Sequence, residues 1–191
     1  MFRPMSFCAI LLLLVLSPVN GLAVELPPKI KVGNLELVQN GAGSREKYFL
    51  DLYEAGLYLL QPNNDAAAII NADAPMLIHI VITSKLVSQE KLIASLQEGF
   101  KNSTKGKTEP IKNEIEKFGQ CFAEEITRGN IFDLLYIPGR GVTVLKNGKK
   151  RGVIPGLAFK KALFGIWLGD RPADTNLRQA LLGGKSKVER K

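Results

Sequence analysis

The pattern of apolar and polar positions along the chain predicts short strands separated by amphipathic helices. Residues 35–38 and 48–60 carry apolar and aromatic side chains between polar ones, on either side of Asn40-Gly41-Ala42-Gly43. They predict two strands joined by a glycine-rich turn. Residues 76–82 are apolar except for His79. This is typical of a strand near the centre of a sheet with both faces covered.

Helical periodicity occurs between and after the strands. The helix that follows Ser88 has Leu92, Leu96 and Phe100 at every fourth position, and the hydroxyl of Ser88 is a suitable N-cap. Five helices are expected in all: 65–72, the helix capped by Ser88, one opened by Pro110, 157–168, and 174–182.

Three further short strands are predicted around two turns late in the chain. They lie within 133–137, 142–145 and 153–154, and Asn147-Gly148 joins the last two. Both central positions of a type I′ hairpin turn need positive φ, which this pair adopts readily. Because strands and helices do not alternate regularly, we predict an α+β fold in one domain. Its expected form is a large antiparallel sheet covered on one face by a layer of helices.

The N-terminus has the features of a secretory signal peptide. Arg3 precedes an apolar run at 7–16, and Gly21 and Ala23 supply the small residues that a signal peptidase needs. The run is too short to span a bilayer as a helix. We therefore expect cleavage after residue 23, a folded domain over 24–184, a basic tail over 185–191, and a periplasmic or secreted protein.

Charge and cysteine content narrow the classes of partner. The net charge is +8, with basic residues clustered around 146–151 and in the tail. We favour solvated surface as their interpretation, with weak contact to an anionic membrane surface as the alternative. No aromatic residues interleave the charges, so nucleic-acid binding is not expected.

Cys121 is the one cysteine after the signal segment, so no intramolecular disulfide is predicted. We expect a monomer.

The common catalytic motifs are missing from the sequence. His79, the single histidine, lies inside a predicted strand, and no serine has the setting of a hydrolase nucleophile. Gly139-Arg140-Gly141 lacks the remaining glycines of a phosphate-binding loop. We therefore expect no metal and no cofactor, and we interpret His79 as a core or half-buried residue.

Several motifs in order along the chain resemble the chalcone isomerase superfamily, in its bacterial secreted chalcone-isomerase-like branch. They cover nearly the whole mature chain: Asn40 to Arg45, Leu52 to Leu59, Asn147-Gly148, Val153 to Gly156, and Leu163 to Asp170. The resemblance implies an open-faced β-sandwich whose large sheet carries a helical layer, with a ligand cleft between them. It also implies that Arg45, from the glycine-rich segment, enters this cleft.

The residues of the catalytic branch are mostly replaced here. Tyr53 stands where that branch has a threonine, and Ser88 and Ser95 stand where it has a tyrosine and an asparagine. Ile166 and Trp167 replace a small polar residue and a methionine. In the fatty-acid-binding relatives an arginine and a tyrosine at these positions hold a carboxylate, and this chain has Arg45 and Tyr53.

We therefore expect a non-catalytic binder of a small amphipathic carboxylate such as a fatty acid. The expected ligand-binding residues are Arg45, Tyr53, Ser88, Ser95 and Trp167, with Leu92, Leu96, Phe164 and Trp167 along the apolar tail.

Two alternatives stay open at this point. One is an intramolecular lyase, an isomerase that uses Arg45 for the anion and Tyr53 for proton transfer. The other is an envelope protein with a vestigial cleft. Eight residues of straight strand span about 26 Å, so the chain must bend between Arg45 and Tyr53 if both touch one ligand.

Overall fold

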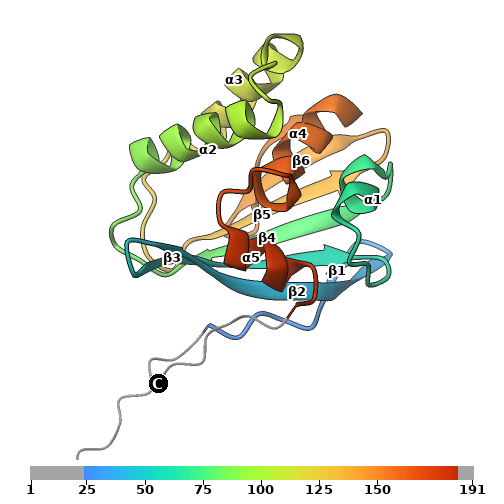
Figure 1. Cartoon of the computed structure of the whole chain (residues 1–191), viewed down its shortest axis with the longest axis horizontal. Coiled ribbons are helices and arrows are strands. Elements are labelled where there is room, and N and C mark those ends of the chain that lie inside the picture. The colour runs from blue at the N-terminus through green and yellow to red at the C-terminus, as the bar shows by residue number, and fades with distance from the viewer. Residues whose placement is uncertain (1–23, 185–191) are drawn as a thin grey trace, which may run out of the picture.

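The computed structural model describes residues 24–184, which form one seven-stranded antiparallel sheet with helices on one face (Figure 1). Each strand pairs with its neighbours in sequence. The strands are β1 (Lys29–Val32), β2 (Leu35–Lys47), β3 (Leu50–Leu59), β4 (Met76–Ile82), β5 (Ile131–Ile137), β6 (Gly141–Lys146) and β7 (Lys149–Ile154). The expected signal segment, 1–23, and the basic tail, 185–191, lie outside the described residues.

The helical layer and the sheet enclose the main core. Its helices are α1 (Ala66–Asn71), α2 (Gln89–Ser103), α3 (Lys112–Gln120, after a 3₁₀ turn at Glu109–Ile111), α4 (Leu157–Leu168) and α5 (Thr175–Leu181). Ile78 and Ile82 of β4 point into this core, where they meet buried aromatic residues such as Phe100 and Phe159. The predicted α+β fold, an open-faced β-sandwich with a covering layer of helices, is confirmed.

The other face of the sheet has a smaller apolar cluster of its own. Leu37, Tyr58, Leu77 and Leu135 form it, so β4 is apolar on both faces as expected for a central strand. The segment before β1 crosses this side (Figure 1), where the Tyr58 hydroxyl donates to the carbonyl of Pro27 at 2.7 Å. His79 is half-buried on this face of the sheet, and its Nδ1 atom lies 2.6 Å from the Asp133 Oδ1. This position agrees with the structural role predicted for His79.

The prediction of a turn at Asn40-Gly41-Ala42-Gly43 is wrong, because β2 continues through these residues with only a shift of register at Asn40. The two glycines serve close packing instead. A Cβ at Gly41 would lie 2.0 Å from the carbonyl oxygen of Ala180, and one at Gly43 would lie 2.8 Å from the Ala180 Cβ. Helix α5 therefore packs directly on the backbone of β2 (Figure 1). Glycine in a strand often marks such an approach, which sequence reasoning cannot distinguish from a turn.

The turn between β2 and β3 lies further along, at Tyr48 and Phe49. Lys47 pairs with Leu50, so the loop has two residues, and both have positive φ, 51° and 64°. The hairpin between β6 and β7 has the same geometry at Asn147 and Gly148, with φ of 50° and 74°. Bulky aromatic residues are strained in this conformation, whereas Asn-Gly is the preferred pair. The chain therefore keeps two unfavourable residues at the end of this hairpin.

Replacing this turn with the preferred pair should stabilise the protein. For Tyr48→Asn/Phe49→Gly we expect the free energy of unfolding to rise by about 1 kcal/mol, because the positive-φ strain is relieved. The midpoint of thermal unfolding should rise by about 2–4 °C for a domain of this size. Thermal and denaturant unfolding of both proteins measure this. A lower stability would mean that the aromatic side chains make contacts on which the fold depends.

A fully buried lysine ties α4 to α1. The Lys160 Nζ donates to the carbonyls of Ile69, Ile70 and Ala72 at 2.8–2.9 Å. These carbonyls end the short helix α1, whose last turn has no further residues to bond them. Burial is the main cause that lowers the pKa of Lys160 to about 8. The Lys160 ammonium group, which belongs to α4, thus acts as the C-terminal cap of α1.

Candidate functional site

The hairpin of β2 and β3 brings Arg45 and Tyr53 together. Because the chain reverses at Tyr48 and Phe49, Arg45 and Tyr53 are direct partners across the two strands. The Arg45 Cζ lies 5.7 Å from the centre of the Tyr53 ring, within the range of a cation–π contact. The separation of about 26 Å estimated for a straight strand does not arise, since the turn falls between the two residues.

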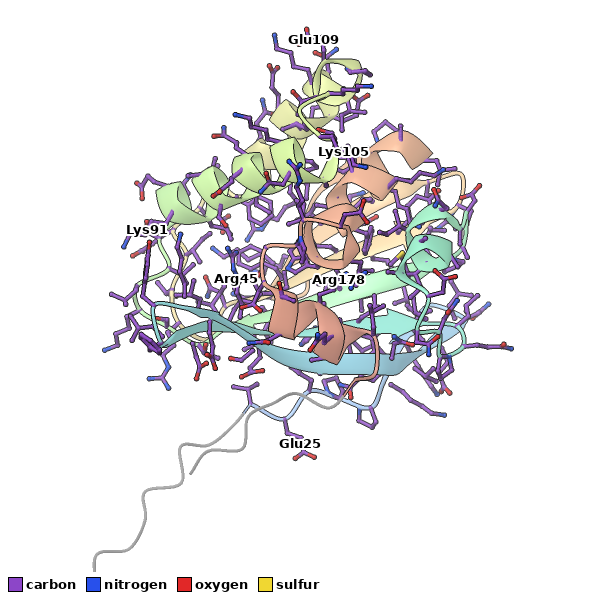
Figure 2. All side chains as sticks on the ribbon, viewed as in Figure 1. Glu25, Arg45, Lys91, Lys105, Glu109 and Arg178 are labelled. Carbon is purple, nitrogen blue, oxygen red and sulfur yellow. The ribbon has the colours of Figure 1, made fainter. Side chains whose placement is uncertain are left out.

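Two helices complete this group of side chains. The Arg45 Nη1 donates to the Ser95 Oγ of α2 at 2.9 Å, and the Trp167 Nε1 of α4 donates to the Tyr53 hydroxyl at 2.9 Å. Figure 2 shows Arg45 between the sheet and the helical layer. Four of the five expected site residues therefore form one connected group, running from Ser95 through Arg45 and Tyr53 to Trp167.

Ser88, the fifth expected residue, lies outside this group. Its Oγ accepts the backbone N–H of Lys91 at 3.4 Å and donates to the Glu90 carboxylate at 2.8 Å. Ser88 is thus the N-cap of α2, as its position also predicted, and it lines neither of the two cavities that border Arg45.

Arg45 and Tyr53 separate an open groove from a small inner cavity. The groove has a volume of about 440 Å³ and runs between the β2–β3 hairpin and the first half of α2. This is within the range of small-molecule sites. The inner cavity, bounded by Leu96, Trp167 and the core, has only about 20 Å³, roughly the space of one water molecule.

Only some of the residues expected to contact an apolar tail line a cavity. The expected residues are Leu92, Leu96, Phe164 and Trp167. Leu92 lines both spaces, whereas Leu96 and Trp167 line only the inner cavity, which has no room for an acyl chain. Phe164 is buried and lines neither. The space for a tail lies in the outer groove. Its apolar walls include Leu50, Leu52, Leu86 and Val87, residues that sequence reasoning did not select.

The charges around the groove favour an anion. Arg45, Lys47 and Lys91 line it, opposed by Glu98 alone among the acidic residues. Arg45 takes part in none of the ion pairs found between described residues. Its Nε is buried and makes no hydrogen bond within the described chain. A half-buried guanidinium with no carboxylate partner and an unused donor is a suitable place for an anionic ligand.

Metal-binding and membrane-spanning features are not found over residues 24–184. No group of three or more histidine, cysteine, aspartate or glutamate side chains is placed there to hold a metal ion. Within the same range, no helix has the length and apolar character of a membrane span. Cys121 is buried, and burial raises the pKa of its thiol, as expected for a small core residue.

Comparison with known proteins agrees with this architecture. No curated protein sequence matches the chain. Among solved structures, a fatty-acid binding protein of Arabidopsis thaliana is similar, with a TM-score of 0.69 and 20% sequence identity over 82% of this chain and 90% of that chain. At this identity the likeness shows a shared fold. The family model for chalcone isomerase-like proteins matches residues 19–183, almost the whole sequence. The chain therefore belongs to the chalcone isomerase-like family.

Proposed function

We propose that this protein is an exported, non-catalytic binder of a small amphipathic carboxylate such as a fatty acid. The observation that carries the proposal is the Arg45 guanidinium, which borders the groove without a carboxylate partner and with an unused donor at Nε. A carboxylate beside it would form charge-assisted hydrogen bonds, whose strength exceeds that of neutral ones. The fatty-acid binding relative in fold is consistent with this use.

The groove also has the form that an amphipathic molecule requires. Its inner end is polar, with Arg45 and Ser95, and its walls toward the hairpin turn are apolar, with Leu50, Leu52 and Leu86. Because the inner cavity holds no more than about one water, we place the carboxylate at Arg45 and the tail along the outer groove. The hydrogen bond between Trp167 and Tyr53 lies behind the carboxylate position and closes the inner end.

Two measurements test the proposal. Native mass spectrometry of the protein purified from its host should detect a bound acid. Titration calorimetry should show binding of dodecanoate and much weaker binding of dodecan-1-ol, which has the same tail without the charge. Equal affinity for the acid and the alcohol, or binding of neither, would contradict the proposal.

Tyr53 should assist the arginine through its hydroxyl. Its oxygen accepts from Trp167, so the hydroxyl proton remains to be donated to a carboxylate beside Arg45. We expect Tyr53→Phe to weaken dodecanoate binding by about 1–2 kcal/mol, the contribution of one hydrogen bond to a charged group. Trp167→Phe is the matched control, because it removes the same internal bond and keeps the hydroxyl. Equal losses in the two variants would show that Tyr53 acts only through its internal hydrogen bond with Trp167.

A further inference from the structure

Exposed apolar side chains gather at the mouth of the groove. Tyr48, Phe49 and Leu50 at the hairpin turn are 82%, 102% and 48% exposed, and Leu86 in the loop before α2 is 49% exposed. These four residues, here called the apolar tip, are most of the large exposed hydrophobic residues within 24–184. The others are Val24, Leu60 and Val153. Tyr48, Leu50 and Leu86 also line the groove, so the tip and the groove are continuous.

The fold does not account for the aromatic residues of this tip. Both are strained by positive φ, and Phe49 contributes nothing to the core because its side chain is fully exposed. The same type of turn elsewhere in the chain is made by Asn147 and Gly148 without strain. Strained, exposed and apolar residues at the entrance of a site indicate contact with something outside the chain.

Charged residues of both signs surround the tip and the groove. Lys47 and Lys91 line the groove, and the Lys47 Nζ lies 5.7 Å from the Tyr48 ring. Figure 2 shows Lys91 at the start of α2, on the side of the hairpin. Glu46, Asp51, Glu90 and Glu98 are the acidic residues nearby; Glu90 accepts a hydrogen bond from Ser88, and Asp51 accepts one from Ser44.

Strand pairing adds two more lysines to this end of the sheet. Tyr53 of β3 pairs with Ile82 at the end of β4, and the residue before Ile82 in β4 pairs with the first residue of β5. The start of β5 in turn lies beside the end of β6. The turn after β6, next to Lys149 and Lys150, is therefore at the same end of the sheet as the β2–β3 hairpin. β7, which carries both lysines, is four strands along the sheet from β3, about 19 Å. Apolar and aromatic residues with lysines at their flanks are the composition of segments that lie in a membrane interface.

The small size of the tip favours a membrane over a protein. A stable protein interface takes about 20–30 residues from each side. Four apolar side chains fall well short of that number, whereas a few inserted side chains with basic neighbours suffice for reversible membrane contact. A second copy of this chain is disfavoured on the same ground.

We propose that the apolar tip docks this protein onto lipid bilayers that contain anionic lipids, with the mouth of the groove facing the lipid. The docking itself is independent of any ligand. Its purpose rests on the proposed function, since a bilayer would supply or receive an amphipathic acid through the adjoining groove.

The test is binding of the ligand-free protein to vesicles of phosphatidylcholine alone and of phosphatidylcholine with phosphatidylglycerol at a ratio of 3:1. We expect binding to the mixed vesicles that is weakened by salt, and weaker binding to phosphatidylcholine. Leu50 and Leu60 form a matched pair, because Leu50 begins β3, Leu60 directly follows the last residue of β3, and they are 48% and 45% exposed. Leu50→Asn should lower the partition coefficient about tenfold, and Leu60→Asn should leave it unchanged.

Two further variants locate the contact and guard against misfolding. Tyr48→Asn/Phe49→Gly is expected to fold more stably and yet to lose vesicle binding. In Phe49→Trp, brominated lipid should quench the new tryptophan and spare the buried Trp167.

Three results would overturn the proposal. They are no binding to either kind of vesicle, equal losses for Leu50→Asn and Leu60→Asn, and a self-association in sedimentation that depends on the tip and replaces vesicle binding. Arg45→Ala should keep vesicle binding. A failure of dodecanoate binding alone would therefore count against the proposed function and leave the docking intact.

Discussion

Arg45→Ala is expected to lower the affinity for dodecanoate by about a hundredfold and to leave the domain folded. The loss corresponds to about 3 kcal/mol, which is the contribution of two hydrogen bonds from a guanidinium to a carboxylate. Folding should persist because the side chain is half-buried at the groove and gives up one hydrogen bond, to Ser95. Calorimetry gives the affinity and thermal unfolding gives the stability.

Two more variants separate recognition of the carboxylate from general attraction. Arg45→Lys keeps the charge and loses the planar pair of donors, so it should bind nearly as poorly as Arg45→Ala. Arg178→Ala is the control, because Arg178 is also half-buried and bonds the carbonyl of Leu168 away from the groove (Figure 2). If Arg45→Ala unfolds the protein, or if it binds dodecanoate as well as the unmodified protein does, Arg45 is a structural residue.

Lys160→Met should destabilise the protein by about 3 kcal/mol at pH 7. Methionine fills a similar volume, but it leaves the buried carbonyls of Ile69, Ile70 and Ala72 without the donor that they have now. The thermal midpoint should fall by about 6–12 °C. Lys161→Met on the same helix is the control, because Lys161 is only half-buried and its replacement should change stability by less than about 0.5 kcal/mol.

The pH dependence of this difference provides a second check. The pKa of Lys160 is about 8 in the folded protein and has its ordinary value of 10.5 in the unfolded chain. Between these values the unfolded chain binds more protons, so this residue raises the free energy of unfolding as the pH increases. Burial raises the pKa of Tyr136 to about 12. Above about pH 10 this residue lowers the free energy of unfolding as the pH increases, and it does so in both the unmodified protein and Lys160→Met. The stability gap between the two proteins should therefore widen from about pH 8 to about pH 10. A constant gap would contradict the shifted pKa.

Local signals in the sequence determine much of this fold. Residues 157–168 are predicted as a helix and form α4 with the same bounds, because a long apolar run between glycine and proline punctuation leaves few alternatives. Ser88 caps α2, and Asn147-Gly148 makes the predicted hairpin turn with positive φ at both positions. In each case the information lies within a few neighbouring residues, which is why sequence alone suffices.

The β2–β3 hairpin shows where local information fails. Its glycines carry the usual signal of a turn, yet they lie in a strand because α5, more than a hundred residues later, packs on them. The actual turn carries Tyr48 and Phe49, which give no such signal. β1 is not among the predicted strands either, because its alternation of exposed and half-buried residues extends over only four positions.

The composition of the candidate site follows from the sequence, and its geometry follows from the tertiary structure. The sequence and its family resemblance select Arg45, Tyr53, Ser95 and Trp167, which the structure brings into one connected group. Only the packed helices decide that Ser88 stays outside the group and that the inner cavity holds about one water. A side chain's chemistry is a property of its residue type, whereas the space beside it depends on every element that packs there. The sequence therefore determined which side chains could bind an anionic group, and the fold determined where the apolar tail of such a ligand could lie.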